Sequence, residues 1–336
     1  MSIEIIIGLP HLSQGPILDR ACTLRRPALI SADGLSRWST RRGWREWAGW
    51  GLGQLQNARG LEALCLDSAG FVAAAQYGGF PWSLADYVAL AAAYPFRWWA
   101  SADYCVEAEI ARDRDEVDDR LARTIRANLD CRRLAEDQGI ADTLMPVIQG
   151  RRPTDYERCV DALWRSIKPG ALIGIGSMCR RDIHGPEGLA AVVDHLDQIL
   201  PAGVRLHAFG VKGTALPYLL PFAHRIASID SQAYGVGARR AAHCGGISKS
   251  DAFVADHLER WVRAQDARLA KTARRLPHAA RQVLDPQPSD PWEAAIAQAR
   301  AEIRELIKTG ELDHDEITAP WIEQWAADLY RGHRRG

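Results

Sequence analysis

Three acidic residues of this chain each follow a short apolar run. Asp67 closes "LEALCLD", Asp103 closes "RWWASAD" and Asp230 closes "IASID". A carboxylate at the end of a buried run costs desolvation free energy unless it is paired or used. One such acid is often only the N-cap of the following helix, whereas three acids after three separate runs indicate a site. Exchange at a glycosidic carbon needs two carboxylates with different roles, as in glycosidases, and this set could supply them.

The ends of the apolar runs also carry residue types that suit a flat heterocycle. A purine has apolar faces and a fixed set of hydrogen-bond donors and acceptors at its edge, so it favours aromatic walls, an acid and an amide. The candidates, besides Asp103, are Ser68, Phe71, Gln149, Gly174, Gly176, Phe209 and Gly210. The glycines would let a ligand approach the backbone. The alternatives are that both phenylalanines pack in the core and that Gln149 caps a loop.

Eight runs with β-strand character alternate with helical patterns. They cover residues 3–10, 27–31, 61–67, 97–103, 144–150, 171–177, 205–211 and 226–230. This alternation predicts parallel strands covered by helices. Eight units favour an α/β fold of the (β/α)₈ barrel type, in which the C-terminal ends of all strands face one mouth. No GxGxxG motif opens the first unit, which argues against a dinucleotide-binding fold.

Helix signals occupy the intervals between the strands. Ser83 is a candidate N-cap for a helix over 83–94, and 115–139 has apolar residues at helical spacing and ends at a glycine. Thr154, with Glu157 three residues on, predicts a capping box for a helix over 154–167. Pro186 indicates the first turn of a helix over 185–200.

The pattern changes after residue 248. Residues 249–276 have a helical pattern, 285–291 form a turn or linker, and 292–310 and 319–336 indicate two more helices. We therefore expect two domains, a catalytic barrel over 1–248 and a helical C-terminal extension over 249–336.

The composition limits the function classes. The chain has 336 residues, of which 47% are hydrophobic, enough for a full core. Its 42 basic and 42 acidic residues give a net charge of zero, which argues against a non-specific nucleic-acid coat. Contact with nucleic acid would use local basic patches, at 40–47, 150–158, 179–184, 237–243 or 271–281. The tryptophans at 38, 44, 47 and 50 fit a core or a lid better than a sugar cleft.

The cysteines and the N-terminal residues indicate a reducing compartment. The seven cysteines are odd in number and include no CxxC pair, which argues against a disulfide scaffold. The opening "MSIEIIIGLP" has no basic segment before its short apolar run, and no run approaches the length of a membrane span. We expect a cytoplasmic protein.

Five motifs together resemble a known family. "LDSAGF", "VIQG", "LIGIGS", "LHAFGVKG" and "IASIDS" occur in the order and rough spacing of the tRNA-guanine transglycosylases. "LDSAGF" resembles that family's DSGGF element, with alanine for one glycine. "PHLS", "GSMCRR" and "AFGVKG" resemble more closely the branch that modifies DNA, the 7-deazapurine DNA transglycosylases. The resemblance covers about residues 60–240 and implies a (β/α)₈ barrel that exchanges guanine in DNA for a 7-deazaguanine base.

The resemblance also implies a role for each matched residue. Asp230 matches the nucleophile that attacks C1′ of the target nucleotide, and Asp67 matches the second acid, which handles protons on the exchanged bases. Asp103 would accept hydrogen bonds from the N1–H and 2-amino groups of the purine. Gln149 would contact the O6 side, helped by backbone N–H groups near Gly174 and Gly176. Phe71 and Phe209 match the walls of the purine slot, and Ser68 and Gly210 belong to the same predicted base site.

One departure concerns metal. Many members of that family carry a zinc site with three closely spaced cysteines and a histidine after the barrel, but this chain keeps only Cys244 there, with His243 and His257 nearby. A lone cysteine cannot build the usual tetrahedral site. We expect no metal and no cofactor, and a buttress made instead by packing of the C-terminal helices.

The expected partners are DNA, the 7-deazaguanine base and partner proteins of a DNA-modification cluster. The candidate phosphate contacts, after the sixth and eighth strands, are Arg180, Arg181, Arg239 and Arg240. The alternatives are a tRNA-guanine transglycosylase, a non-catalytic nucleic-acid-binding subunit and a barrel glycosidase. The presence of both Asp67 and Asp230 argues against a non-catalytic subunit.

Overall fold

The computed structural model describes residues 3–41, 44–272, 291–292, 294–296, 298–299, 302–303 and 319–333. The chain divides into two compact units, residues 1–276 and 277–336.

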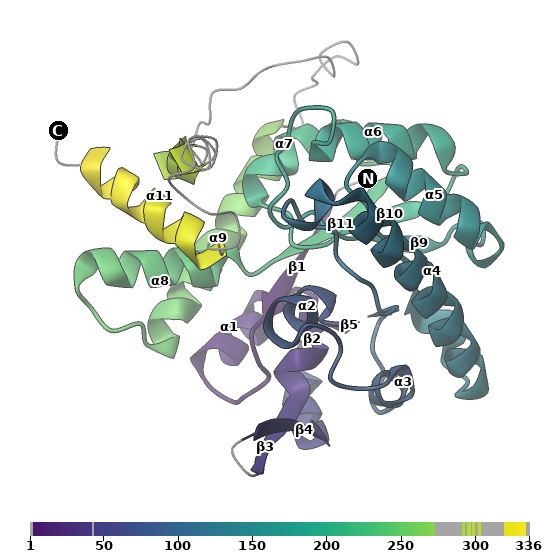
Figure 1. The fold of residues 1–336 in the computed structure, drawn as a ribbon. Helices are drawn as coiled ribbons and strands as arrows, with labels where there is room; N and C mark the ends of the chain where they lie inside the picture. Colours follow the sequence, from purple (N-terminus) through teal and green to yellow (C-terminus); the bar gives the residue numbers. More distant parts are fainter. Residues whose placement is uncertain are drawn as a thin grey trace. The chain divides into compact units, whose positions relative to one another are not determined.

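Nine parallel strand segments build the first unit (Figure 1). They are β1 (Glu4–Leu9), β2 (Ala28–Ser31), β5 (Leu64–Asp67), β6 (Trp99–Ala100), β7 (Leu144–Met145), β8 (Val147–Ile148), β9 (Leu172–Ile175), β10 (Arg205–Ala208) and β11 (Ile226–Ser231). Their order in the sheet is β7-β6-β5-β2-β1-β11-β10-β9-β8. All eight predicted strand runs are present, and the fifth is split into β7 and β8.

The sheet curls into a nearly closed barrel because its two end segments are consecutive in the chain. Only Pro146, which has no N–H to donate, separates β7 from β8. Met145 accepts a hydrogen bond from the N–H of Ser101 at 2.9 Å, and Pro146 accepts one from the N–H of Gly174 at 2.8 Å. One stretch of chain therefore joins β6 to β9. This arrangement confirms the predicted (β/α)₈ fold.

Alternate strand residues fill the barrel interior, as expected for a closed sheet. The buried set is Ile6, Leu29, Cys65, Trp98, Ala100, Met145 and Val147, with Leu172 and Phe209 packed against it. The opposite faces of the strands pack against the surrounding helices in two larger apolar clusters.

Helices surround the barrel in the described chain. They are α1 (Pro16–Leu24), α2 (Gly70–Tyr77), α3 (Leu84–Ala92), α4 (Arg114–Asp137), α5 (Pro153–Leu163), α6 (Leu189–Ile199), α7 (Leu216–Leu219), α8 (Ala233–Gly245) and α9 (Asp251–Thr272). Five of them, α3, α4, α5, α6 and α9, overlap the predicted helical intervals. Ser83 caps α3 as predicted: its hydroxyl accepts from the N–H of Asp86, whose carboxylate accepts from the N–H of Ser83.

Two predicted helix starts are wrong. Helix α5 begins at Pro153, a residue suited to the first helical position. The carboxylate of Asp155 accepts a hydrogen bond from the N–H of Arg152 at 2.9 Å, whereas the prediction placed a capping box on Thr154. Helix α6 begins at Leu189 after Gly188, so Pro186 lies in the preceding loop.

An antiparallel hairpin after β2 was not predicted. Its strands are β3 (Ser36–Arg41) and β4 (Trp44–Trp50), with Trp38 opposite Trp47. The alternation of side chains in this segment is interrupted at "RRG", so the pattern gave no clear strand signal. Trp47 and Trp50 pack against the core cluster beneath it, as the predicted core or lid requires.

Helix α9 belongs to the first unit. Val254, Leu258 and Val262 are buried in the same apolar cluster as residues of β1, α1 and α8. The division after residue 276 therefore differs from the boundary that we placed at 248, because α9 packs on the barrel helices.

In the second unit, α11 (Ala319–His333) is the predicted last helix. Ala295, Ala299 and Ala326 form a small buried cluster within that unit. The predicted linker, apart from residue 291, and most of the predicted helix 292–310 lie outside the described residues. Among the described helices, none is both long and apolar enough to cross a membrane.

Candidate active site

The three predicted acids meet at the C-terminal end of the barrel. Asp67 is the last residue of β5, Asp230 lies one residue before the end of β11, and Asp103 follows β6. Burial, reinforced by the negative charges of Asp103 and Asp230, raises the pKa of Asp67 to about 7. A carboxyl group with this pKa can both give and take a proton near neutral pH.

The turn after Asp67 brings α2 against Asp103. Ala69 has a left-handed backbone, with φ 70° and ψ 25°, and its N–H donates to Asp67 Oδ2 at 3.1 Å. This is the position at which the family's motif has glycine, which adopts that conformation at less cost. A side chain on Gly70 would overlap the carbonyl oxygen of Asp103. The small residues of "LDSAGF" therefore serve close packing between the turn and Asp103.

Two neighbours hold the carboxylate of Asp103. Ser68 donates to Oδ1 at 2.7 Å, and the amide nitrogen of Gln149 donates to Oδ2. Burial raises the pKa of Asp103, while these two hydrogen bonds oppose the rise. Ser68 thus lies behind Asp103 as a positioning residue.

The amide of Gln149 is itself fixed. Its Oε1 accepts from the hydroxyl of Ser177 at 2.6 Å, and that hydroxyl accepts from the N–H of Val106 at 2.7 Å. Ser177 has φ 55°, an uncommon conformation outside glycine that suggests a functional constraint. A chain of hydrogen bonds therefore orients the amide that faces Asp103.

The prediction places backbone N–H groups near Gly174 and Gly176 beside the base. The N–H of Gly174 donates to Pro146 at 2.8 Å and that of Gly176 donates to Ile148 at 3.0 Å, so neither is available to a base. Both glycines instead make space. A Cβ on Gly176 would overlap the amide of Gln149, and one on Gly174 would lie 2.6 Å from the ring of Phe209.

Asp230 is buried, with 7% of its surface exposed, and has two close neighbours. The N–H of Gly210 donates to its Oδ1 at 2.9 Å, in a turn where Gly210 has φ 63°. Nε2 of His207 lies 3.3 Å from the same oxygen. His207 is fully buried, its Nδ1 is 2.8 Å from the hydroxyl of Ser228, and its Nε2 makes no hydrogen bond.

His207 was missed by the sequence analysis. A signal existed, since His207 is the one polar residue of "LHAFGV", two residues before Phe209. On a strand, residues two apart share a face, so His207 points into the barrel with Phe209. Glu107 was also missed: it is buried, and burial raises its pKa although Arg180 opposes the rise.

The two predicted aromatic walls lie on different elements. Phe209, after β10, packs edge-to-face on His207, with ring centroids 4.6 Å apart, and contacts the layer around Trp98. Phe71, in the first turn of α2, lies 5.0 Å from the guanidinium carbon of Arg180. Both residues are partly exposed.

One of the four predicted phosphate contacts is wrong. Arg181 is buried, and its five N–H donors go to the carbonyls of Ser177, Arg151, Glu187 and Gly150 and to the hydroxyl of Tyr156. A guanidinium has only five donors, so none remains for a phosphate.

The other three predicted phosphate contacts are less buried. Arg180 is 3.9 Å from Glu109, and on α8 Arg239 is exposed and Arg240 half-buried.

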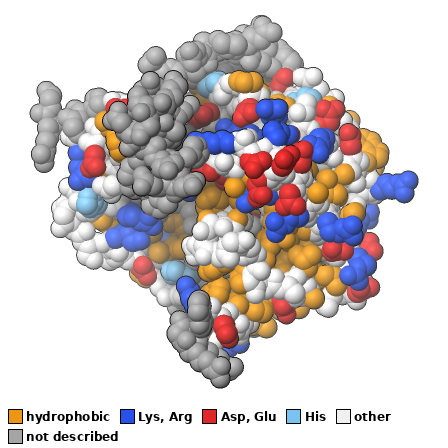
Figure 2. Space-filling model, in the orientation of Figure 1, with side chains coloured by type: hydrophobic (Ala, Val, Ile, Leu, Met, Phe, Trp, Pro, Cys, Tyr) orange, Lys and Arg blue, Asp and Glu red, His pale blue; other side chains and the backbone are white. Residues whose placement is uncertain are grey.

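No metal site is present among the described residues, because no three His, Cys, Asp or Glu side chains there are placed to hold an ion. Cys244 is exposed near the end of α8. On the face shown in Figure 2, the acidic and basic side chains of the described residues are interspersed.

Comparison with protein families identifies the chain. The model of the DpdA family, DeoxyPurine in DNA protein A, matches residues 53–303, about three quarters of the sequence. The chain belongs to the DpdA family. This membership confirms the resemblance to the DNA-modifying branch and supports a transglycosylase-like function on DNA at the level of the family. A search of curated proteins found no match to this DpdA-family chain.

Proposed function

We propose that this DpdA-family protein exchanges guanine in DNA for a 7-deazaguanine base, through a covalent bond between Asp230 and C1′ of the target nucleotide. The observation that carries the proposal is the pairing of two carboxyl groups in different environments at one barrel end. Asp230 accepts a hydrogen bond from Gly210, whereas the pKa of Asp67 is raised to about 7. Separate environments for two acids suit a nucleophile and a proton carrier.

In the first half of the reaction, a carboxylate oxygen of Asp230 attacks C1′. The bond from C1′ to the guanine nitrogen breaks, and the base leaves with the electron pair and takes a proton from Asp67. The product is a glycosyl ester of Asp230. The target nucleotide must leave the base stack for this attack, because C1′ is otherwise out of reach.

In the second half, the 7-deazaguanine base gives its ring N–H proton to the carboxylate of Asp67. The nitrogen attacks C1′ on the face from which guanine left, and the ester bond to Asp230 breaks. Two displacements at one carbon retain the stereochemistry. Asp67 returns to its acid form, ready for the next turnover.

Base selection falls to Asp103 and Gln149. Each carboxylate oxygen of Asp103 accepts one hydrogen bond from the protein and has capacity for another. These oxygens suit the N1–H and 2-amino donors of guanine, an arrangement that adenine lacks. Phe71 and Phe209 would bound the purine faces, and Arg180, Arg239 and Arg240 would contact phosphates.

The test is capture of the covalent intermediate. Wild-type protein, mixed with DNA and no incoming base, should give a protein–DNA band on a denaturing gel, and Asp230→Asn should give none. The exposed Asp161→Asn in α5 is the matched control and should behave as wild type. A band from Asp230→Asn would reject this nucleophile. Nucleoside analysis that found the new base in tRNA and not in DNA would reject the substrate.

A further inference from the structure

The exchange reaction gives no role to the β3–β4 hairpin of the first unit. It precedes residue 53, where the match to the DpdA family begins, so family membership assigns it nothing. Between residues 36 and 50 the chain places four of its 12 tryptophans and four arginines, against one acidic residue. For a chain of zero net charge, this is a strong local concentration of positive charge and aromatic surface.

The root of the hairpin adjoins the candidate active site. Strand β2 ends at Ser31, which pairs in register with Asp67, and a short 3₁₀ turn (Ala32–Leu35) leads into β3. On the other side, the ring of Tyr77 contacts that of Trp38 at an interplanar angle of 37°, with centroids 4.7 Å apart. Tyr77 ends α2, the helix whose first turn carries Phe71. Two elements of the site therefore support the hairpin.

Aromatic packing fixes the hairpin to the barrel unit. The rings of Trp47 and Trp50 are 5.0 Å apart, and Trp50 lies 4.9 Å from Trp82. The indole N–H of Trp50 donates to the carbonyl of Asp86 at 2.9 Å. The hydroxyl of Tyr77 donates to Asp33 at 3.0 Å. A hairpin held in this way keeps its remaining side chains at a fixed place beside the mouth.

The exposed side chains of the hairpin are suited to a nucleic-acid strand. The guanidinium carbon of Arg45 lies 4.5 Å from the ring centroid of Trp38, and the ring of Tyr77 contacts the same indole. Arg45 and Arg37 are exposed, and within the described chain neither forms an ion pair. Unstacked bases bind on aromatic rings and guanidinium planes, while arginines also neutralise phosphates.

We propose that the hairpin is a DNA-binding arm, which holds the unpaired segment beside the extruded nucleotide: a base stacks on the guanidinium plane of Arg45, and the charges of Arg37 and Arg45 neutralise two phosphates. The proposal rests on the proposed function in taking DNA as the partner. The arm acts in binding and leaves the chemistry to Asp230 and Asp67. A strand of six residues extends roughly 20 Å, enough to follow several nucleotides.

The experiment measures the affinity of the full chain for a short fluorescein-labelled single-stranded DNA at several salt concentrations. Arg37→Ala/Arg45→Ala should weaken binding about tenfold at low salt. It should also reduce the slope of log affinity against log salt by about 1.4, because each contact to a single strand contributes ~0.7. Arg45→Lys keeps the charge and loses the planar stack, so it should weaken binding about threefold and keep the slope.

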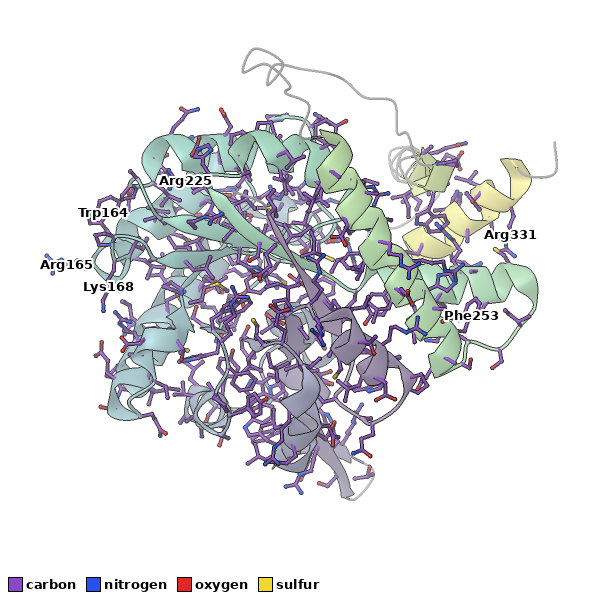
Figure 3. All side chains as sticks on the ribbon, turned by 180° about the vertical axis from the view of Figure 1, so that it is seen from behind. Trp164, Arg165, Lys168, Arg225, Phe253 and Arg331 are labelled. Carbon is purple, nitrogen blue, oxygen red and sulfur yellow. The ribbon has the colours of Figure 1, made fainter. Side chains whose placement is uncertain are left out.

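The matched control is Arg165→Ala/Lys168→Ala, which removes the same charge. Both residues are exposed beside Trp164, on the segment that precedes β9, and Figure 3 shows the three together at one edge of the ribbon. Trp164 is itself 51% exposed, so the control also has an aromatic neighbour. Affinity and slope should equal those of wild type.

Three outcomes would overturn the arm: an unchanged slope in Arg37→Ala/Arg45→Ala, an equal loss in the control, or binding of RNA of the same sequence in preference to DNA. Gel capture of the covalent intermediate, run in parallel, tests the chemistry separately. If Arg37→Ala/Arg45→Ala loses binding and wild type forms no adduct, the proposed exchange reaction is rejected and the DNA-binding arm is supported. If wild type forms the adduct and all variants bind DNA equally well, the DNA-binding arm is rejected and the exchange reaction is supported.

Discussion

At the scale of single residues, the raised pKa of Asp67 predicts how the rate of adduct formation depends on pH. Its pKa is raised to about 7 by burial and by two neighbouring carboxylates, against about 4 in an unfolded chain. Because the acid form protonates the leaving guanine, formation of the adduct should slow as the pH rises through about 7. Rapid-quench measurements of adduct formation at several pH values should show this fall in rate for wild type. The rate of Asp67→Asn should not depend on pH in the same range.

The same pKa has a consequence for stability. The folded protein binds the proton of Asp67 more tightly than the unfolded chain does, so ionisation destabilises the fold increasingly between pH 4 and 7. Asp67→Asn removes that penalty. Its melting temperature should exceed that of wild type at pH 8, and the difference should disappear below about pH 4. Equal differences at both pH values would contradict the raised pKa.

His207 makes a second prediction, as a positioning residue for Asp230. Its buried Nε2 lies 3.3 Å from the carboxylate, and its other nitrogen contacts Ser228. His207→Leu should slow formation of the adduct, because the carboxylate of Asp230 would exchange a polar neighbour at 3.3 Å for an apolar one. The KM for the incoming base should be unchanged. His207→Gln, which retains a polar nitrogen of similar reach, should restore part of the rate; equal rates in both variants would refute the assignment.

Gly176 makes a third prediction about base affinity. A Cβ there would overlap the amide of Gln149, which donates to Asp103. Gly176→Ala should therefore weaken guanine binding about ten- to a hundredfold, as Gln149→Ala should. Gly53→Ala, where a Cβ meets no atom within 4 Å, is the control. Equilibrium binding of guanine to the three variants checks this, and normal affinity in Gly176→Ala would show that the amide is not needed there.

At the scale of elements, α9 supports the barrel. Leu258 is fully buried in the cluster shared with α1 and α8. Leu258→Ala should reduce the free energy of unfolding by about 2–5 kcal/mol through the lost contacts and the cavity left behind. Leu129→Ala, at a site 45% exposed, should change it by less than about 0.5 kcal/mol. Denaturant unfolding of both variants measures the difference.

The packing of α9 bears on the prediction that the protein binds no zinc. We expect a chelator to leave the melting temperature unchanged, because the buttress is apolar packing. Stoichiometric zinc in the purified protein, bound through Cys244, would overturn this expectation. Ion pairs at the rim of α9, such as Arg26 with Asp266 at 2.9 Å, are partly exposed and contribute little by comparison.

At the scale of the whole molecule, the division into two units predicts the effect of a truncation. Every residue assigned to the exchange lies before residue 277, and the first unit has its own buried clusters. The chain cut after Leu276 should therefore fold and still form the adduct with DNA. Calorimetry and gel capture of the truncated chain check both parts. A truncated chain that shows no cooperative unfolding transition in the calorimeter would show that the second unit is required for stability.

The sequence by itself determined the barrel and the three acids. Parallel strands alternate with amphipathic helices, and this order leaves few topologies for a chain with eight such units. Because the C-terminal ends of the strands share one mouth, Asp67, Asp103 and Asp230 could be placed together before any coordinates were known. The order of the motifs was also sufficient for the family, since it depends on residue types and spacing alone.

Tertiary structure decided which side chains remain available. Arg180 and Arg181 are adjacent in the sequence and are the same residue type, yet the fold buries Arg181 with all five donors engaged and places Arg180 over Phe71. The N–H groups of Gly174 and Gly176 are likewise used between strands. His207 was missed because a single polar residue in an apolar run does not show what it faces. Burial and hydrogen-bond partners are set by residues distant in the sequence, and only the folded chain brings those residues together.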